Sequence, residues 1–259
     1  MERRKFLGKG VSGTFLIGAA AGVPAGVAGT LAVAPNLLRE CLPVNSSYAQ
    51  QGEDIVLHHI LRYVLNAKVP TYLDVGAHHP ITHNNTYFLY ERGARGVLVE
   101  PNPAFHGLLE QERPRDTLVR AGIGVTAQTE ADYYVIGPGD GQLNTFSREQ
   151  AEKLVATSKG DLRIERVIKL PLLSINELML KHWNGPPNLL SLDTEGFDLP
   201  ILRSLDFDRL RPDVICAETL EIGGHRLLTD IPQFMAQKGY DVRGGSFVNT
   251  IFIDRRHLA

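Results

Sequence analysis

Hydrophobic positions follow two alternating spacings along the chain from Tyr48 onward. Residues 53–65 place apolar side chains three to four positions apart, which predicts a helix, and Pro70 ends that stretch. Residues 72–76 then form a short apolar run that predicts a buried strand. The same two patterns repeat to the C-terminus. They predict further helices over 84–92, 103–112, 147–156, 175–182, 199–205 and 231–238, and further strands over 97–99, 118–125, 131–136, 167–173, 189–192, 214–217 and 247–253.

Strands that alternate with helices predict an α/β protein with a mostly parallel sheet and helices on both faces. With 259 residues, the chain is long enough to bury a sizeable core. Its apolar share of 43% and its charged share of 22% exclude a disordered chain. Two cysteines are too few for a disulfide scaffold or a four-thiolate zinc site.

The first 40 residues follow a different pattern. A basic stretch at residues 3–9 (RRKFLGK) precedes residues 10–34, which carry no charged side chain. We predict that residues 1–40 are a twin-arginine-like export signal or a membrane anchor, with membrane association through residues 10–34. Pro35 disfavours cleavage after the small residues before it, which keeps the anchor open. The protein would then be cytoplasmic, attached to the inner membrane, or exported. A start site assigned too far upstream is a further explanation of this segment.

Acidic residues stand at or just past the ends of four predicted strands. They are Asp74, Glu100, Asp193 with Glu195, and Glu218. Ligands of open parallel sheets bind at the carboxyl ends of the strands, where these acids would converge. Carboxylates gathered on one edge repel each other unless hydroxyl groups, amines or a cation satisfy them. We therefore expect a ligand that donates hydrogen bonds or carries positive charge. The alternative for any single acid is a cap on the helix that follows it.

The first predicted strand and its turn narrow the class of ligand. Gly76 lets the backbone approach a ligand closely, and Glu100 ends the next strand, where an acid can accept bonds from ribose hydroxyls. A nicotinamide dinucleotide site would need three glycines at the turn to seat a pyrophosphate, and the turn at 76–80 has one. Asp74 would also repel a pyrophosphate. Both features favour a ligand with an amine and a sulfonium, which is S-adenosylmethionine.

Five short motifs follow one another along the chain, roughly from Tyr48 to Asp254. They are SYAQQGED at 47–54, YLDVGAHHP at 72–80 with NNT at 84–86, VEPNP at 99–103, LDTEGFD at 192–198 and VNTIF at 248–252. Together they resemble the motifs of FkbM-type methyltransferases. The resemblance implies a class I methyltransferase domain over residues 46–259, with a Rossmann-like, mostly parallel seven-stranded sheet and S-adenosyl-L-methionine as cofactor. It also implies O-methylation of a hydroxyl group, often on a sugar or polyketide-like acceptor.

The resemblance and the strand ends together select the candidate site residues. Glu100 would bind the ribose, and the turn after the first strand would line the methionine part of the cofactor. Asp193 and Glu195 stand where the transferred methyl group should emerge, to contact the cofactor amine or to orient the acceptor. The predicted cofactor-binding residues are Asp74, Gly76, Ala77, His79, Asn85, Glu100, Pro101, Asn102 and Asp193, and the predicted catalytic residues are Asp193, Glu195 and His78.

Three histidines, His78, His79 and His83, follow the first predicted strand. One of them could act as a general base, because imidazole titrates near neutral pH. They could also bind a metal together with Asp193, although their spacing matches no recognised metal motif. The plainest interpretation is a polar loop beside the cofactor, and we assign no metal ligand.

The formal net charge of -2 bears on the partners. A general nucleic-acid partner would need a basic excess, so we expect none. The expected partner is a small-molecule or glycan acceptor. Two other functions stay open at this point. One is a nicotinamide-dependent oxidoreductase, which the single glycine disfavours, and the other is an exported or membrane-anchored binding module that keeps the fold without the reaction.

Overall fold

The computed structural model describes residues 46–139, 141–221 and 226–258. The predicted signal or anchor at residues 1–40, including the uncharged stretch 10–34, lies outside these ranges. Within the described ranges, no helix has both the length and the apolar character needed to cross a membrane.

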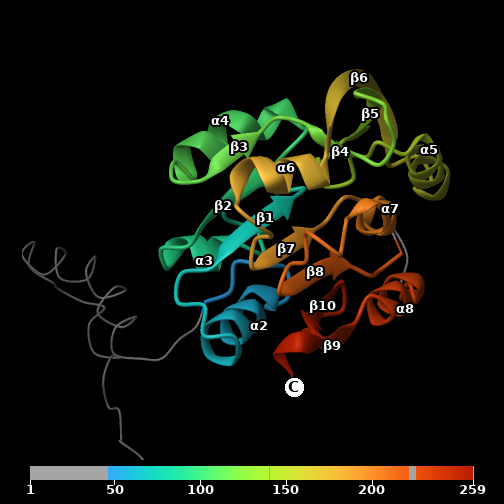
Figure 1. The fold of residues 1–259 in the computed structure, drawn as a ribbon. Coiled ribbons are helices and arrows are strands. Elements are labelled where there is room, and N and C mark those ends of the chain that lie inside the picture. The colour runs from blue at the N-terminus through green and yellow to red at the C-terminus, as the bar shows by residue number, and fades with distance from the viewer. Residues whose placement is uncertain (1–45, 140, 222–225, 259) are drawn as a thin grey trace, which may run out of the picture. The chain divides into compact units, whose positions relative to one another are not determined.

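Helices and strands alternate along the described chain (Figure 1). The helices are α2 Glu53–His59, which continues as the π-helical segment η1 Ile60–Val64, α3 Tyr87–Glu91, α4 Pro103–Glu112, α5 Arg148–Thr157, α6 Ile175–His182, α7 Asp198–Ser204, α8 Asp230–Gln237 and the short 3-10 helix η2 Arg255–His257. The strands are β1 Thr71–Val75, β2 Arg95–Val99, β3 Thr117–Val119, β4 Gly122–Gly124, β5 Glu130–Gly137, β6 Arg163–Ser174, β7 Leu189–Leu192, β8 Val214–Glu218, β9 Tyr240–Gly245 and β10 Asn249–Asp254.

The main sheet has seven strands in the order β3-β2-β1-β7-β8-β10-β9. Strand β10 runs antiparallel to both of its neighbours, and the remaining strands are parallel to one another. The first five strands of this sheet therefore follow the Rossmann arrangement, with the chain reversing direction across the sheet between β1 and β7. This confirms the predicted mostly parallel, seven-stranded sheet.

Helices cover both faces of the main sheet, as predicted. On one face, α6, α7 and α8 contribute apolar side chains to a core that includes Leu73 and Val75 of β1. On the other face, α2, α3 and α4 pack against Tyr72 of β1 and Leu98 of β2. Because side chains alternate along a strand, Asp74 points to the same face as Tyr72 and away from Val75.

A second, three-stranded sheet in the order β4-β6-β5 was not expected. The predicted strand at 118–125 is in fact two strands in different sheets, because the chain turns at Arg120 and Ala121 between β3 and β4. The predicted strands at 131–136 and 167–173 pair with each other outside the main sheet. Strand β9 was missed, since it lies at the edge of the main sheet and Tyr240 is its one buried residue.

A buried arginine fixes the chain around the turn after β1. The Arg113 side chain is wholly buried and pairs with Asp116 at 2.7 Å. It also donates hydrogen bonds to the Tyr72 hydroxyl at 2.9 Å, to the Thr86 hydroxyl at 3.1 Å and to the Pro80 carbonyl at 3.1 Å. These contacts tie the end of α4 to β1 and to the loop that leads into α3.

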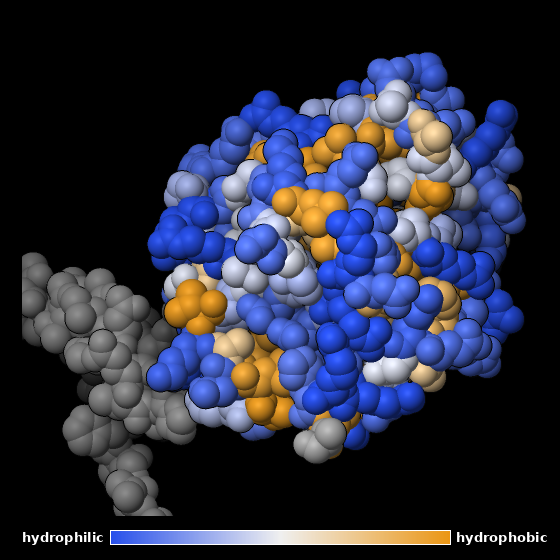
Figure 2. All heavy atoms as spheres, viewed as in Figure 1, coloured by the Kyte–Doolittle hydropathy of each residue, from blue (hydrophilic) through white to orange (hydrophobic). Residues whose placement is uncertain are grey.

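Apolar side chains on the face shown in Figure 2 occur in separate patches surrounded by polar ones. The large exposed apolar residues are spread over several elements, for example Tyr63, Val167, Leu180 and Phe247. Scattered residues of this kind are normal on a protein surface, so the site must be sought in the cavities.

Candidate active site

A cavity lies at the carboxyl ends of β1, β2 and β7. It opens where the chain reverses direction across the sheet, which is the expected ligand position in an open α/β sheet. It is lined by Gln50, Val75, Gly76, His78, His83, Val99, Glu100, Pro101, Gly122, Ile123, Tyr133, Gly141, Gln142, Asn144, Thr145, Phe146, Asp193, Thr194, Glu195, Phe197 and Ile201.

Gly76 holds three strand ends together at the floor of this cavity. Its φ of 84° is left-handed, and a Cβ atom at this position would come within 1.9 Å of the Asp193 carbonyl oxygen. The Gly76 N–H donates to the Val99 carbonyl at 2.9 Å, and the Asp193 N–H donates to the Val75 carbonyl at 3.0 Å. Only glycine satisfies both the backbone angle and the close approach of the turn to β7.

Glu100 places a buried carboxylate at the end of β2. One oxygen accepts the His78 N–H at 2.7 Å, and the other accepts the Asn102 N–H at 2.6 Å. Burial raises the pKa of Glu100 to about 7, an effect that these two N–H groups oppose and the charge of Asp74 reinforces. Each oxygen keeps a further lone pair, so the ionised group can still accept hydrogen bonds from a ligand diol.

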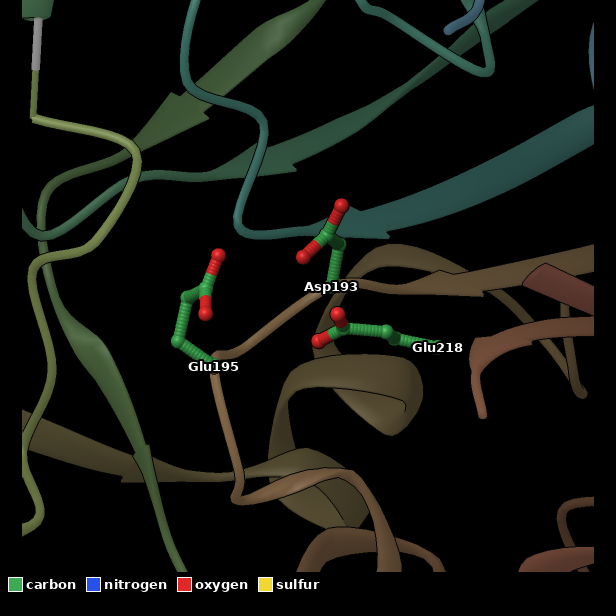
Figure 3. A group of neighbouring side chains, drawn as sticks. All are labelled: Asp193, Glu195 and Glu218. Atoms are coloured by element: carbon green, nitrogen blue, oxygen red, sulfur yellow. The ribbon is translucent and has the colours of Figure 1, made fainter. Parts of the chain in front are cut away.

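Asp193, Glu195 and Glu218 form an acidic triad beside the cavity (Figure 3). Their carboxylate oxygens lie within 4.8 Å of one another. Asp193 follows β7, Glu195 lies in the next loop, and Glu218 ends β8. Among the described residues, none of the three forms an ion pair with a lysine or arginine. The predicted convergence of acids is therefore real for these three residues.

Burial and mutual repulsion make ionisation of the triad costly. Burial is the main cause that raises the pKa of Asp193 to about 7 and that of Glu218 to about 11. It also raises the pKa of Glu195, and repulsion by neighbouring carboxylates adds to the rise in all three. The charge of Asp198, at the start of α7, repels each member of the triad.

The cavity brings together part of the predicted site. Six of the predicted residues line it, namely Gly76, His78, Glu100, Pro101, Asp193 and Glu195. The remaining predicted residues, which are Asp74, Ala77, His79, Asn85 and Asn102, lie outside its lining. Their direct contact with a cofactor stays a prediction.

The residues outside the lining have contacts that shape the surrounding loops. Asp74 accepts the Thr86 hydroxyl at 2.6 Å on the far face of β1. Asn102 caps α4, because its side chain accepts the Ala104 N–H at 3.1 Å. His79 Nδ1 accepts two N–H groups of its own loop, at 3.1 Å and 3.0 Å.

Asn85 and Ala77 are buried on the same face of the sheet as Asp74. Asn85 reaches Cys216 of β8, with its Nδ2 atom 4.0 Å from Sγ, and Ala77 packs in the core against α2 and α3. Cys216 is buried and free. The metal alternative that combined histidines with Asp193 is not what the structure shows: among the described residues, the group able to hold an ion contains carboxylates alone.

Part of the cavity wall comes from the second sheet and its loops, and the sequence did not single out Tyr133 or Thr145 there. Tyr133 of β5 is buried there, and the Thr145 hydroxyl donates to the Glu195 carbonyl at 3.1 Å. His83, which also lines the cavity, lies 3.2 Å from the Gln142 amide. Gln50 lines the cavity from the motif at 47–54, and its place in that motif was the one available signal.

The fold and the cavity together define a class of protein. The sheet is Rossmann-like, the pocket lies at its reversal point, and a buried acid ends β2 where a ribose can bind. The turn after β1 presents no glycine-rich pyrophosphate cradle. The class is an α/β protein that binds a nucleoside with a positively charged or hydrogen-bond-donating group.

The family follows from the sequence comparison. The family model described as the methyltransferase FkbM domain matches residues 74–242, which is more than half of the chain. The chain belongs to this family, and it is a methyltransferase that depends on S-adenosyl-L-methionine. No curated protein sequence matches the chain.

Three solved methyltransferase structures are similar to this chain. A TehB-like SAM-dependent methyltransferase from Corynebacterium glutamicum is 10% identical with a TM-score of 0.42, and the match covers 88% of this chain and 98% of that chain. Precorrin-6y C5,15-methyltransferase from Geobacter metallireducens is 15% identical with a TM-score of 0.40, over 81% of this chain and 92% of that chain. The 1,6-didemethyltoxoflavin-N1-methyltransferase from Burkholderia thailandensis, with bound S-adenosylhomocysteine, is 11% identical with a TM-score of 0.39, over 90% and 92%. At these values the likeness carries no argument about this chain's substrate.

The residues around the cavity fit S-adenosylmethionine. Glu100 has free lone pairs for ribose hydroxyls, and the missing Cβ of Gly76 lets the turn after β1 pack against β7 at the cavity floor. Asp193 and Glu195 border the same space and suit a positively charged amine or sulfonium. When bound, this cofactor supplies a methyl group already activated by attachment to a positively charged sulfur.

Proposed function

We propose that the protein methylates a hydroxyl oxygen of a sugar or of another small or glycan acceptor. The observation that carries this proposal is the acidic triad at the cavity wall, because carboxylates accept hydrogen bonds and protons from hydroxyl groups. The acceptor oxygen bonds to the methyl carbon while the carbon–sulfur bond breaks, and the electron pair of that bond stays on sulfur. The hydroxyl proton passes to a nearby base of the protein.

Four residues that line the cavity have a role in this scheme. Glu100 holds the ribose hydroxyls, and Asp193 orients the amine of the cofactor or the acceptor. Glu195 and His78 are the candidate bases, since both line the cavity, and the His78 ring is held 4.1 Å from the ring of Phe105. The protein would hold the acceptor and the cofactor in a reactive orientation. In well-oriented reactions, holding two reactants in this way lowers the activation barrier by about 7–11 kcal/mol.

The cofactor part of the proposal is tested by calorimetric titration of the purified full-length chain. We expect S-adenosylmethionine to bind and NAD to show no heat of binding. Glu100→Ala should weaken S-adenosylmethionine binding at least about tenfold, because hydrogen bonds to a charged group contribute about 1.5–3 kcal/mol. Glu130→Ala, which removes an exposed acid at the start of β5, is the control. Absence of S-adenosylmethionine binding to the unaltered chain would refute the proposal.

The acceptor part is tested with S-adenosylmethionine that carries a labelled methyl group. A panel of sugars and oligosaccharides should yield labelled products that survive mild alkali, since methyl ethers resist it and methyl esters are cleaved. Labelled products that mild alkali destroys would instead indicate transfer to a carboxyl group.

A further inference from the structure

Four basic side chains gather at the edge of the main sheet opposite the candidate active site. Strands β1 and β2 begin at this edge, whereas the active-site cavity lies at their carboxyl ends. One small hollow is lined by Arg62 of η1, Lys68 before β1 and Arg92 after α3. Arg95 begins β2, and it is paired with Thr71 at the start of β1, close to that hollow. We call Arg62, Lys68, Arg92 and Arg95 the basic edge.

The positive charge of the basic edge is largely unopposed. Among the described residues, its members form one ion pair, between Arg92 and the exposed Glu91 at 3.1 Å. Two acids on neighbouring elements, Asp116 and Asp213, are each already paired with another side chain. The described part of the chain thus sets one carboxylate against four permanent positive charges. Such an edge attracts a polyanionic surface.

Large apolar side chains protrude beside these bases. Tyr63 is 68% exposed, Val64 is 50% exposed and Val69 is 63% exposed. Tyr63 follows Arg62 directly in the chain, and Val69 follows Lys68, so apolar and basic groups share one surface. An anionic membrane surface matches this combination, because its phosphate groups bind the bases while its headgroup boundary accepts aromatic and aliphatic side chains. A nucleic acid would match the charge but would offer no apolar layer.

The described chain also begins beside the basic edge. The Tyr48 hydroxyl donates to Glu91 at 2.9 Å, and the Tyr48 ring lies 6.5 Å from the ring of Phe88. The Arg92 guanidinium in turn lies 3.4 Å from the centre of the Phe88 ring. The chain therefore enters the domain next to Arg92, directly after the segment that the sequence predicts to be an export signal or membrane anchor. A tether of that kind would bring this edge of the domain to the membrane.

We propose that the basic edge, together with Tyr63, Val64 and Val69, docks the domain on a membrane surface that contains anionic lipids. The four bases bind lipid phosphate groups, and the three apolar side chains enter the headgroup boundary. Each base close to such a surface strengthens binding about fivefold. The active-site cavity lies at the other ends of β1 and β2, away from the lipid, so a water-soluble acceptor can reach it while the domain is docked. This docking does not depend on the proposed methyl transfer.

A tryptophan introduced at Val69 tests the contact with lipid. Full-length Val69→Trp is mixed with vesicles of phosphatidylcholine and phosphatidylglycerol that carry brominated acyl chains, which quench tryptophan fluorescence at short range. We expect quenching beyond that of the native Trp183 in the unaltered chain, and less of it in vesicles of phosphatidylcholine alone. Val167→Trp is the control, because Val167 is exposed on β6, on the side of the molecule away from α2 (Figure 1). Equal quenching at both positions, or at neither, would overturn the proposal, whether or not residues 1–40 insert.

A second set of variants tests the charge. Adding Arg62→Gln and Lys68→Gln to Val69→Trp should weaken docking at least about tenfold and remove most of the quenching, as high salt should also do. Adding Lys159→Gln and Arg166→Gln instead removes the same charge from exposed positions near α5 and on β6, and should keep the quenching. Quenching that survives the first pair would overturn the role of the bases.

Two further measurements complete the test. Equal melting temperatures of all variants would show that lost quenching does not mean misfolding. Binding of a mixed-sequence RNA oligonucleotide is measured with the same samples. An oligonucleotide that binds through Arg62 and Lys68, without quenching of the tryptophan at position 69 by lipid, would overturn the membrane surface in favour of a nucleic acid. S-adenosylmethionine binding enters none of these measurements, so their failure leaves the proposed function standing.

Discussion

Glu100 is a buried carboxylate held close to the balance between its protonated and ionised forms. The protein buries it, which favours the protonated form, and then directs two backbone N–H groups at it, which favours the ionised form. The balance raises the pKa of Glu100 to about 7. Small changes around neutral pH therefore change how well this group accepts hydrogen bonds.

This balance predicts a pH dependence of nucleoside binding. If ribose hydroxyls bind the ionised form of Glu100, binding lowers its pKa, so affinity rises with pH and levels off above about 7. S-adenosylhomocysteine is the suitable probe, because it lacks the sulfonium charge. We expect calorimetry to show roughly tenfold tighter binding at pH 8 than at pH 6. Glu100→Gln should bind more weakly and with a smaller pH dependence, the remainder coming from Asp193, whose pKa is also raised to about 7. An undiminished pH dependence in this variant would assign the titration to another group.

Single residues also show what sequence can and cannot locate. Glu100 and Asp193 lie directly after buried strands, as the pattern predicts, whereas their roles toward a ligand stay predictions. Asp74 lies within its strand, and the period of two turns it away from the cavity that Val75 lines.

At the scale of elements, the predictions succeeded where local chemistry sets the boundary. Helix α4 begins at Pro103 behind its Asn102 cap, and both are visible in the sequence. The second sheet could not be foreseen, because β5 and β6 have the same strand pattern whether they join the main sheet or pair apart from it. Edge strand β9 has too few buried side chains to show a hydrophobic period.

The contacts of Arg113 connect the end of α4 to β1 and to the loop that leads into α3. Arg113→Met should lower the free energy of unfolding by about 3–5 kcal/mol, because it leaves the buried carboxylate of Asp116 without its partner. Urea unfolding measures the change. Arg115→Met is the matched control. Arg115 is exposed and donates one hydrogen bond, to the Tyr90 carbonyl at 2.6 Å, so its loss should cost no more than about 1 kcal/mol. Equal losses in the two variants would contradict this account.

At the scale of the whole molecule, Asp254 connects the end of β10 to the segment before β8 and to the short helix η2. Its buried side chain accepts Arg211 Nε at 2.6 Å and Arg256 Nε at 2.8 Å. Burial raises the pKa of Asp254, but the hydrogen bonds from the two arginines outweigh it and hold the pKa at about 2. A depressed pKa in the fold means that stability is present above the ordinary value near 4 and is lost as pH falls toward 2.

Asp254→Asn should therefore lower the free energy of unfolding by about 2–3 kcal/mol at pH 7. The gap from the unaltered chain should shrink between pH 4 and pH 2, as the wild-type carboxylate takes up its proton. Urea unfolding at pH 7, 5 and 3 measures both effects. Asp241→Asn, which breaks the more exposed pair with Arg255, should change stability by less than about 1 kcal/mol. A gap that stays constant with pH would assign the effect to packing instead.

The sequence organises the whole molecule into stretches with separate roles. Residues 1–40 lie outside the described structure, and their role as an export signal or membrane anchor stays a prediction. The alternation of elements from residue 48 onward was sufficient to predict the main sheet apart from its edge strand β9, because the other strands and the helices there have a clear hydrophobic period. The cavity walls were less predictable, since they come from segments far apart in the chain.

The second sheet separates the two sides of the cavity along the sequence. One side is encoded largely by residues 75–101, whereas much of the opposite wall is encoded by residues 122–146, which include β4 and β5 of the second sheet. Substitutions in residues 122–146 can therefore reshape the space offered to an incoming substrate while the ends of β1 and β2 stay unchanged.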